Sequence, residues 1–366
     1  MKITAAVLRD AGGPFQLEEL TLADPAPGQV RVRIVGVGFC HTDLLPRTGV
    51  TAPPPLVAGH EGAGVVEAGG DGVTDIAVDD HVVLSYDHCG DCDNCRTGRQ
   101  PYCETFFARN LVGVDGNAPA IAHDAAGRPV AARWFGQSSF ATHSVCDARN
   151  VVKVDPGLPL ELLGPLACSV QTGAGAVFNS LEVAPQSAIA IFGAGAVGLS
   201  AVMAARAAGA GAIVVADLNA ARLAVAEELG ATHTIDSSAE DASRRLRALR
   251  GVHHSLDTTG VPEVIGAAIK ALRPGGVCGL VGAQRGTLHV DPMLLSVGKT
   301  VKGIIEGDAV PRTFIPRLIS LWQDGTFPFD RLITTFPLAE INSAERAAAS
   351  GRVIKPVLLP GTGTQP

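Results

Sequence analysis

The sequence lacks the long hydrophobic runs that a membrane-spanning helix needs. Hydrophobic residues make up 46% of the 366-residue chain, yet no apolar run approaches the roughly 20 residues of a membrane span. The opening stretch, MKITAAVLRD, also lacks a secretory hydrophobic segment. We therefore expect a soluble, cytoplasmic protein with no membrane partner.

Clustered positive charge is absent too. Lys and Arg number 29 against 36 for Asp and Glu, so the formal net charge is −7, and no basic tract stands out. Because binding to a phosphate backbone requires grouped Lys and Arg, we expect no nucleic acid partner. Internal repeats, low-complexity tracts and coiled-coil heptads are missing as well, which excludes repeat and fibrous architectures. A globular chain of this length is expected to form about two domains.

Four of the eight cysteines lie within fifteen residues, in the stretch CGDCDNCRTGRQPYC. Disulfides are an unfavourable explanation because the chain has no export signal and far exceeds the size of disulfide-stapled domains. Four such thiolates can instead surround a tetrahedral Zn²⁺, and a closed shell of this kind leaves no position for substrate. An iron–sulfur cluster and an incidental grouping are the alternatives. We predict a structural zinc site at Cys89, Cys92, Cys95 and Cys103.

The pattern of apolar residues changes near residue 150. Before it, short β-branched runs such as VRVRIVGV and HVVLSY predict an irregular, largely β domain. From about Ser187 onward, strand and helix patterns alternate, which predicts a parallel sheet covered by helices on both faces. The predicted fold class is therefore α/β, and we expect the last strand pattern, RVIKPVLL, to rejoin the first domain.

A glycine motif indicates a nucleotide site. FGAGAVG places Gly193, Gly195 and Gly198 in a G-x-G-x-x-G pattern between an expected strand and an expected helix, where backbone amides favour a pyrophosphate. Such turns also occur for packing alone. Asp217 ends the next expected strand, 19 residues after Gly198, where its carboxylate can accept hydrogen bonds from both hydroxyls of an adenosine ribose. We therefore predict dinucleotide binding.

The same carboxylate decides between two cofactors. Asp217 would repel a 2′-phosphate, so NAD is favoured over NADP. Arg222, five residues on, is the complication because it could attract that phosphate. We interpret Arg222 as packing by the adenosine ribose and expect a large preference for NAD.

A second, dispersed set of residues could hold a catalytic metal. Cys40, His60 and Cys168 supply two thiolates and an imidazole, a sufficient set for a zinc with an open fourth position, and Glu61 adjoins His60. The competing explanation is structural, because a lone buried cysteine behaves as a small hydrophobe and a histidine among glycines is often a turn residue. The residues alone leave both interpretations open.

Six motifs, taken in order, carry a resemblance over nearly the whole chain: GFCHTD, GHEGAGVVEAGG, the four-cysteine stretch, LACSVQTG, FGAGAVG and GRVIKP. They resemble the zinc-dependent alcohol dehydrogenases of the medium-chain dehydrogenase/reductase superfamily. The stretch GIIEGDAVPRTFIPRLISLWQDGTFPFDRLI is similar to the aryl (benzyl) and allylic alcohol dehydrogenase branch. The resemblance implies a GroES-like β-rich catalytic domain from residues 1–169 and 300–366, a structural zinc lobe at about 85–110, and a Rossmann doubly wound NAD-binding domain at 170–299.

The resemblance also implies the roles of the site residues. Cys40, His60 and Cys168 would hold the catalytic zinc, with Glu61 outside this set or as a transient ligand. Asp43 would hydrogen-bond to His60 and fix its tautomer, and Thr42 would take the alcohol proton. The residues implied at the cofactor are His41, Thr172, Gly193, Gly195, Ala196, Val197, Gly198, Asp217, Arg222 and Lys355, of which His41 and Lys355 would face the pyrophosphate. Those implied at the substrate pocket are Ser85, Trp134 and Phe135, with simple core packing as the alternative for the aromatic pair.

The implied activity is reversible hydride transfer between NAD and a primary aromatic or allylic alcohol, with two zinc ions per subunit and a homodimer or homotetramer. Two positions depart from the family pattern. His41 stands where an arginine often holds the pyrophosphate, and Leu45 stands where a histidine often passes the proton to solvent. A thiol-dependent formaldehyde dehydrogenase, a broad aliphatic alcohol dehydrogenase and a non-catalytic NAD-binding protein are the alternatives.

Overall fold

The computed structural model describes residues 1–49, 51–112, 120–248, 250–284 and 286–362, and it divides into two compact units. The first unit comprises Met1–Cys168, Val310–Pro316 and Leu332–Pro366. The second unit comprises Ser169–Ala309 and Arg317–Arg331. Among the described residues, no helix combines the length and the apolar character that crossing a membrane requires.

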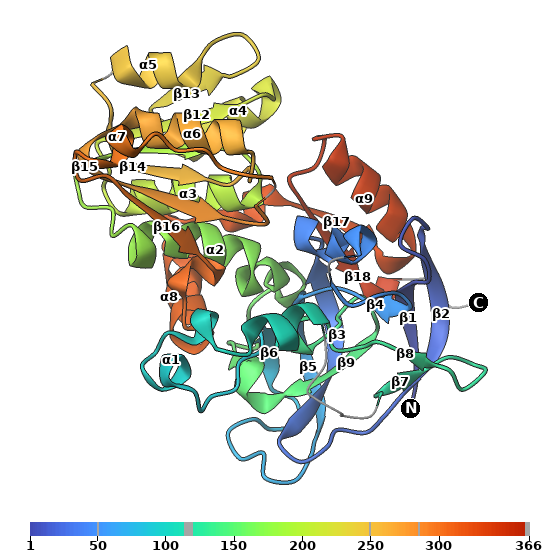
Figure 1. The fold of residues 1–366 in the computed structure, drawn as a ribbon. Helices are drawn as coiled ribbons and strands as arrows, with labels where there is room; N and C mark the ends of the chain where they lie inside the picture. The colour runs from blue at the N-terminus through green and yellow to red at the C-terminus, as the bar shows by residue number, and fades with distance from the viewer. Residues whose placement is uncertain (50, 113–119, 249, 285, 363–366) are drawn as a thin grey trace. The chain divides into compact units, whose positions relative to one another are not determined.

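Two β-sheets make up most of the first unit (Figure 1). One has the order β4-β1-β2-β7-β8, and the other the order β10-β6-β5-β3-β18-β17, with β9 also pairing with β3. The strands are β1 (Lys2–Leu8), β2 (Phe15–Leu22), β3 (Gln29–Gly38), β4 (Leu56–Val57), β5 (Glu61–Gly69), β6 (His81–Leu84), β7 (Ala122–His123), β8 (Pro129–Val130), β9 (His143–Asp147), β10 (Val151–Lys153), β17 (Ile333–Pro337) and β18 (Lys355–Leu359). Its helices α1 (Asp93–Arg96) and α9 (Ile341–Ala349) are short.

Strand β3 brings the ends of its neighbours together. Along it the apolar positions are buried except for Val35, which is half-buried, and neither arginine is buried, as the alternating pattern VRVRIVGV predicts. In the register, Gly38 at the end of β3 pairs with Glu61 at the start of β5 and with Val357 of β18. The pairing of β18 with β3 confirms that the closing strand rejoins the first unit. Cys40, His60 and Lys355 all lie within two residues of these paired positions.

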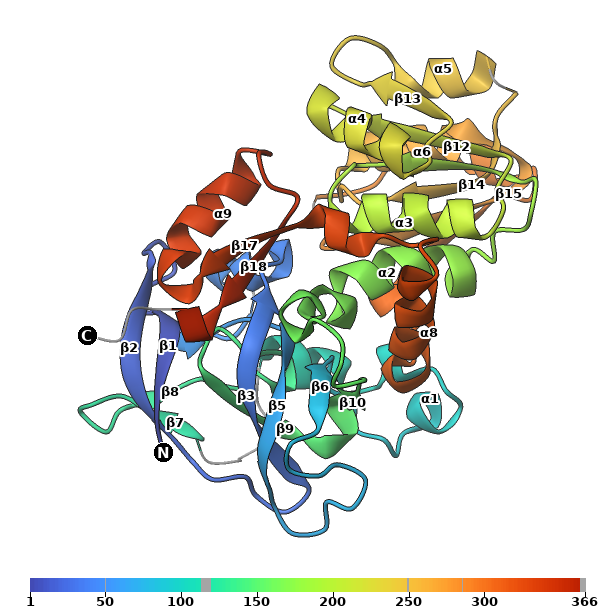
Figure 2. The ribbon, with the colours of Figure 1, turned by 180° about the vertical axis from the view of Figure 1, so that it is seen from behind.

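The second unit contains one six-stranded parallel sheet in the order β13-β12-β11-β14-β15-β16. Figures 1 and 2 show helices on both faces of this sheet. A doubly wound nucleotide-binding fold has this order, so the predicted α/β class is confirmed. The strands are β11 (Ala188–Phe192), β12 (Ala212–Asp217), β13 (His233–Asp236), β14 (Val252–Asp257), β15 (Leu272–Val281) and β16 (Thr300–Ile304). The helices are α2 (Ser169–Gly175), α3 (Ala196–Ala207), α4 (Ala220–Leu229), α5 (Ala242–Ala248), α6 (Pro262–Ala271) and α7 (Pro292–Leu295).

The compact units divide the chain differently from the predicted domains, at residue 169 and between residues 300 and 331. Residues 300–309 and 317–331 group with the second unit, although the prediction ended the nucleotide domain at residue 299. Residues 300–309 do so because β16 (Thr300–Ile304) pairs in parallel with β15 and so extends the sheet by one strand. Helix α8 (Pro311–Gln323) follows this strand and has Pro316 in its interior, where the first unit's share of it ends.

Candidate functional site

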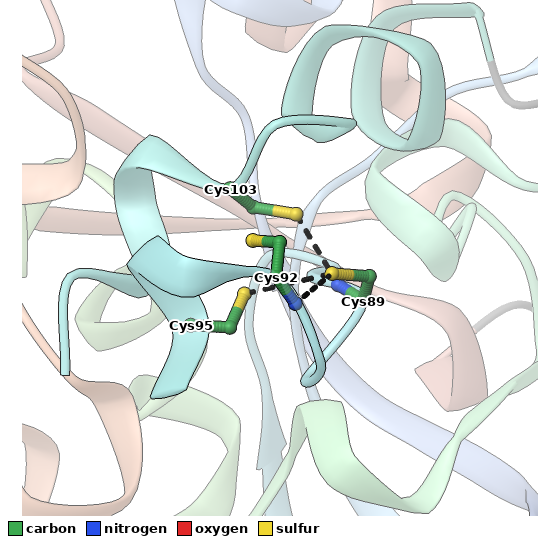
Figure 3. Close-up of side chains that lie close together, drawn as sticks. All are labelled: Cys89, Cys92, Cys95 and Cys103. Carbon is green, nitrogen blue, oxygen red and sulfur yellow. Dashed lines mark hydrogen bonds between the residues drawn. The ribbon is translucent and has the colours of Figure 1, made fainter. Parts of the chain in front are cut away.

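The four cysteines of the CGDCDNCRTGRQPYC stretch converge on one point (Figure 3). Cys95 lies in α1 and Cys92 caps that helix, whereas Cys89 and Cys103 come from the flanking segments. The sulfur atoms all lie within 4.8 Å of one another, and Cys89 Sγ is 3.8 Å from Cys95 Sγ. A tetrahedral zinc with Zn–S bonds of about 2.3 Å separates its sulfurs by about 3.8 Å. The donor set and its spacing therefore fit a zinc ion with a complete protein shell.

Backbone amides point at these sulfurs. The amide of Cys92 donates to Cys89 Sγ, and the amide of Cys89 donates to Cys103 Sγ, each at 3.3 Å. Hydrogen bonds from the amides of Glu104 and Cys95 lower the pKa of Cys92 to about 6. These N–H groups stabilise the thiolate form of Cys92, the charge state that a metal ligand needs, whereas burial raises the pKa of Cys89 and of Cys95.

A second group of metal-ligating side chains consists of Cys40, His60, Glu61 and Cys168. One ligand atom from each lies within 4.8 Å of the others, although the residues are far apart in the sequence. His60 is 1% exposed, and its Nε2 atom has no hydrogen-bond partner among the described residues. Burying a polar atom without a partner costs free energy. A nitrogen in this state beside two sulfurs fits a metal ion.

Three local features bring these ligands to one place. Cys40 caps the turn η1 (His41–Thr48), which directly follows β3. His60 precedes the first residue of β5, and β5 pairs with β3. Cys168 follows the turn η7 (Gly164–Ala167), whose backbone packs against Glu61.

Asp43 lies behind His60 and is fully buried. Its Oδ1 accepts hydrogen bonds from His60 Nδ1 at 2.8 Å, from the Gly59 amide at 3.0 Å and from Trp134 Nε1 at 3.1 Å. Its Oδ2 accepts from the Cys40 amide at 3.0 Å, because Asp43 is the third residue of η1 and reaches back to the cap of that turn. When the imidazole is neutral, Nδ1–H faces Asp43 and the Nε2 lone pair faces the cluster.

The surrounding charges favour a thiolate at Cys40. A hydrogen bond from the Cys168 thiol and the positive charge of Lys355 lower the pKa of Cys40 well below its ordinary value. Burial by itself lowers the pKa of His60, but the Asp43 carboxylate raises it well above its ordinary value. A metal ion binds only the neutral imidazole, so metal binding at His60 competes with protonation and depends on pH.

Lys355, predicted at the cofactor pyrophosphate, lies against Glu61 in the structure. Its Nζ donates to Glu61 Oε2 at 2.9 Å, to Oε1 at 3.0 Å and to the Phe39 carbonyl oxygen at 3.1 Å, and the residue is 2% exposed. These contacts use all three N–H donors of the ammonium. Burial by itself lowers the pKa of Lys355, but the Glu61 carboxylate raises it above its ordinary value. Lys355 therefore neutralises Glu61 beside the metal-ligating cluster, and its role toward the pyrophosphate stays a prediction.

Gly38 and Gly164 lie so close to Glu61 that a side chain at either position would collide with it. A Cβ added at Gly38 would lie 1.9 Å from Glu61 Oε2, and one added at Gly164 would lie 2.2 Å from the Glu61 carbonyl oxygen. Both distances are far below van der Waals contact. Only glycine at these positions lets β3 and η7 approach β5 so closely.

The other residues of FCHTD surround Cys40. Thr42 Oγ1 lies 3.7 Å from Cys40 Sγ, so its hydroxyl adjoins the candidate metal position. His41 is exposed and Leu45 is half-buried in the same turn. The role of His41 toward the pyrophosphate stays a prediction, and the apolar Leu45 supplies no proton carrier.

The predicted pocket residues lie on different sides of the cluster. Phe135 stacks on His60, with ring centroids 4.4 Å apart, and stays the candidate for a pocket wall. Ser85 is fully buried and its hydroxyl donates to the Ala167 carbonyl oxygen at 2.9 Å, so it supports the turn before Cys168.

Trp134 contacts Asp43. The side chain is 2% exposed and its indole N–H donates to Asp43, so it packs behind the cluster, as the alternative of core packing predicts. Sequence reasoning missed the contact of Trp134 with Asp43, and it also missed Gln137, which is 1% exposed.

Gln137 Nε2 donates to the His60 carbonyl oxygen at 2.9 Å and to that of Leu84 at 3.0 Å, which ties the start of β5 to β6. In the sequence, only the polar stretch GQSS after two aromatic residues could have indicated a buried polar residue here.

In the second unit, the glycine motif connects β11 to α3, as predicted. Gly193 has a φ of 98°, and a Cβ at Gly198 would lie 1.8 Å from the Gly193 carbonyl oxygen. Gly195 caps α3, and no side chain caps this helix in the described part of the chain. The first amides of α3, at Ala196 and Val197, are therefore available to an anion. Thr172 is buried in α2.

Asp217 ends β12 beside this turn. Its Oδ2 accepts from the Ala194 amide at 2.6 Å, and its Oδ1 accepts from the Asn219 amide at 2.8 Å. These bonds hold the carboxylate at the glycine turn and leave lone pairs for ribose hydroxyls. Arg222 lies in the first turn of α4, and its Nε has no hydrogen-bond partner among the described residues. Its guanidinium could therefore still bind the 2′-phosphate of NADP, so this alternative stays open.

Two family models match the chain. The model of the alcohol dehydrogenase GroES-like domain matches residues 26–156, and that of the zinc-binding dehydrogenases matches residues 196–323. The geraniol dehydrogenase of Castellaniella defragrans is 48% identical over 361 residues, which are 97% of this chain and 97% of that protein.

Solved structures are similar over the same extent. A protein from Burkholderia ambifaria described as an alcohol dehydrogenase zinc-binding domain protein has a TM-score of 0.96 and 48% identity, covering 98% of this chain and 99% of its own. The benzyl alcohol dehydrogenase of Acinetobacter calcoaceticus has a TM-score of 0.94 and 42% identity, with coverages of 98% and 99%. The family resemblance predicted from the motifs is confirmed. This chain belongs to the zinc-dependent alcohol dehydrogenases of the medium-chain dehydrogenase/reductase superfamily.

Proposed function

We propose that this protein oxidises primary aromatic or allylic alcohols to aldehydes with NAD and catalyses the reverse reduction. The observation that carries the proposal is the cluster of Cys40, His60 and Cys168, with a buried and, among the described residues, unpartnered His60 Nε2 backed by Asp43. The names of two relatives support the substrate class, because geraniol is an allylic alcohol and benzyl alcohol is aromatic.

Each cofactor has residues that would hold it. Cys40, His60 and Cys168 would bind one zinc ion, and the four cysteines of the lobe would bind a second. The glycine turn and Asp217 support NAD, because the carboxylate repels a 2′-phosphate. When bound, zinc polarises the alcohol oxygen as a Lewis acid and NAD accepts the hydride. The oligomeric state and the cytoplasmic location stay predictions.

This chain's own residues handle the proton and shape the site. The Thr42 hydroxyl, beside Cys40, would accept the alcohol proton. Asp43 holds His60 in one orientation, and the Lys355 ammonium balances the charge of Glu61. The Phe135 ring, stacked on His60, offers a flat apolar wall to a conjugated alcohol.

An NAD-coupled panel of kcat/KM values tests the proposal. We expect benzyl, cinnamyl or geranyl alcohol to exceed ethanol by about tenfold or more, because a pocket discriminates by apolar contact. NADP is expected to support a much lower kcat/KM than NAD. If ethanol outperforms benzyl alcohol, the substrate class is wrong, and equal use of NADP would overturn the assignment of NAD. Formaldehyde oxidation that requires an added thiol would favour the thiol-dependent alternative.

Introducing a histidine at position 45 is expected to change the pH dependence of turnover. Leu45→His would add a group that titrates between about pH 5 and 8, and only its neutral form accepts a proton. The kcat for alcohol oxidation should therefore rise through a new inflection near about pH 6.5. Leu45→Gln, which is polar but does not titrate, is the control. If the histidine variant keeps the original profile, proton transfer does not pass this position.

A further inference from the structure

Trp134 makes a polar contact that a core aromatic residue does not need for packing. The residue is 2% exposed, and its Nε1 donates to Asp43 Oδ1 at 3.1 Å. The same oxygen accepts from His60 Nδ1 at 2.8 Å. The indole is therefore connected to a candidate zinc ligand through a single carboxylate oxygen.

The backbone around Trp134 is shaped to keep the indole in this place. The turn η4 (Trp134–Gly136) contains Phe135 with a φ of 51°, and Ser138 follows with a φ of 57°. Both are left-handed conformations that side chains rarely adopt, and such strain persists only where the surroundings hold it. Here the Trp134 amide donates to Ser138 Oγ at 2.8 Å, and that hydroxyl donates to the Val57 carbonyl oxygen at 2.6 Å.

The same turn restrains His60 from a second direction. Phe135 lies against the face of the imidazole, with an interplanar angle of 28°, while Asp43 holds its Nδ1 edge. Oδ1 of Asp43 accepts three N–H donors, so its position is fixed by the backbone of Gly59 and by the indole as well as by His60. Without the indole, Asp43 loses one of its four hydrogen bonds, so the position of the carboxylate and the orientation of His60 are less tightly fixed.

We propose that Trp134 is a positioning residue for zinc: its indole N–H orients Asp43, which in turn holds His60 with Nε2 toward the metal. The inference rests on the proposed zinc site at Cys40, His60 and Cys168. Partners of metal ligands commonly change metal affinity by about 10–100-fold when they are removed. The indole is one hydrogen bond further from the metal than Asp43, so we expect an effect on metal affinity near the lower end of that range.

The chain contains a matched control, because it has only two tryptophans. Trp322 Nε1 also donates to an aspartate, Asp330 Oδ1, at 2.8 Å, but this pair contains no metal-ligating residue. Trp134→Phe should release one of the two bound zinc ions to a chelator about tenfold faster than the unsubstituted enzyme. Trp322→Phe should release both at the original rates.

Two further measurements separate the hydrogen bond from packing. Benzothienylalanine replaces the indole N–H with sulfur and keeps its size, so in the Trp322→Phe background it should accelerate zinc release as Trp134→Phe does. In that same background, ¹⁵N-labelled tryptophan gives a single indole signal, from Trp134, and this signal should shift when the catalytic zinc is removed. This second measurement needs no substitution at position 134, so it holds even if Trp134→Phe fails to fold.

The outcomes distinguish this inference from the proposed function. If Cys40→Ser leaves two zinc ions bound per chain, the zinc site itself is wrong. If Cys40→Ser removes one zinc but the benzothienylalanine protein retains zinc as the unsubstituted enzyme does, Trp134 acts by packing alone and the inference is overturned. An indole signal that does not respond to zinc overturns it as well.

Discussion

Replacing Thr42 with valine is expected to lower kcat for alcohol oxidation by about 10²- to 10⁴-fold, the usual contribution of a positioned proton-transfer group. Valine has nearly the shape of threonine but no hydroxyl, and Thr42 Oγ1 lies 3.7 Å from Cys40 Sγ. The alcohol proton then has no acceptor at this position, whereas the zinc ligands are unchanged. Steady-state kinetics with benzyl alcohol and NAD, together with zinc analysis, measure the effect.

Thr42→Ser is the matched control, because it keeps the hydroxyl and loses only a methyl group. We expect its kcat to stay within about tenfold of the original value, since the proton-transfer group remains. Single-turnover formation of NADH should accompany the steady-state assay, because slow product release hides a slower chemical step. A valine variant with full zinc and an unchanged single-turnover rate would show that Thr42 does not carry the proton.

Replacing Lys355 with methionine is expected to reduce the free energy of unfolding by about 3–5 kcal/mol, the usual cost of leaving a buried charge without its partner. Lys355 is 2% exposed, Glu61 is fully buried, and the ammonium donates to both carboxylate oxygens. Methionine has a similar length and no charge, so the Glu61 carboxylate would lose its counter-charge inside the protein. Denaturant unfolding of the zinc-loaded protein measures the difference.

The double variant Lys355→Met with Glu61→Gln shows whether the charge is the cause. It removes both charges, so we expect it to recover much of the lost stability. A second control is Lys2→Met, which breaks the exposed pair of Lys2 with Glu19 and should cost less than about 1 kcal/mol. If Lys355→Met alone is as stable as the unsubstituted protein, Lys355 is not the counter-charge of Glu61.

Most of the correct predictions from the sequence rest on patterns of residues that are close together in the chain. The alternation of strands and helices after Ser187 corresponds to the parallel sheet, and the glycine motif lies between β11 and α3. The four clustered cysteines meet in space because Cys92 and Cys95 lie at one short helix and Cys89 and Cys103 lie in the segments that flank it. In each case the residues that interact are close in the sequence, so spacing alone indicates the geometry.

Contacts between distant segments required the structure. Lys355 meets Glu61 only because β18 and β5 both pair with β3, and no local pattern near residue 355 indicates that register. Trp134 lies 91 residues from Asp43 in the sequence, and the strained turn that directs its indole leaves no periodic signal. The sequence also placed the edge strand β16 in the wrong unit for a similar reason. Its unit depends on pairing with β15, and no local pattern indicates that pairing.

Anomalous diffraction at the zinc absorption edge, on crystals of the zinc-loaded protein, tests the central claim most directly. We predict two peaks per chain. One should lie among the sulfurs of Cys89, Cys92, Cys95 and Cys103, and the other within about 2.0–2.4 Å of Cys40 Sγ, His60 Nε2 and Cys168 Sγ. A single peak in the four-cysteine lobe, with none at His60 Nε2, would contradict the assignment of a catalytic zinc.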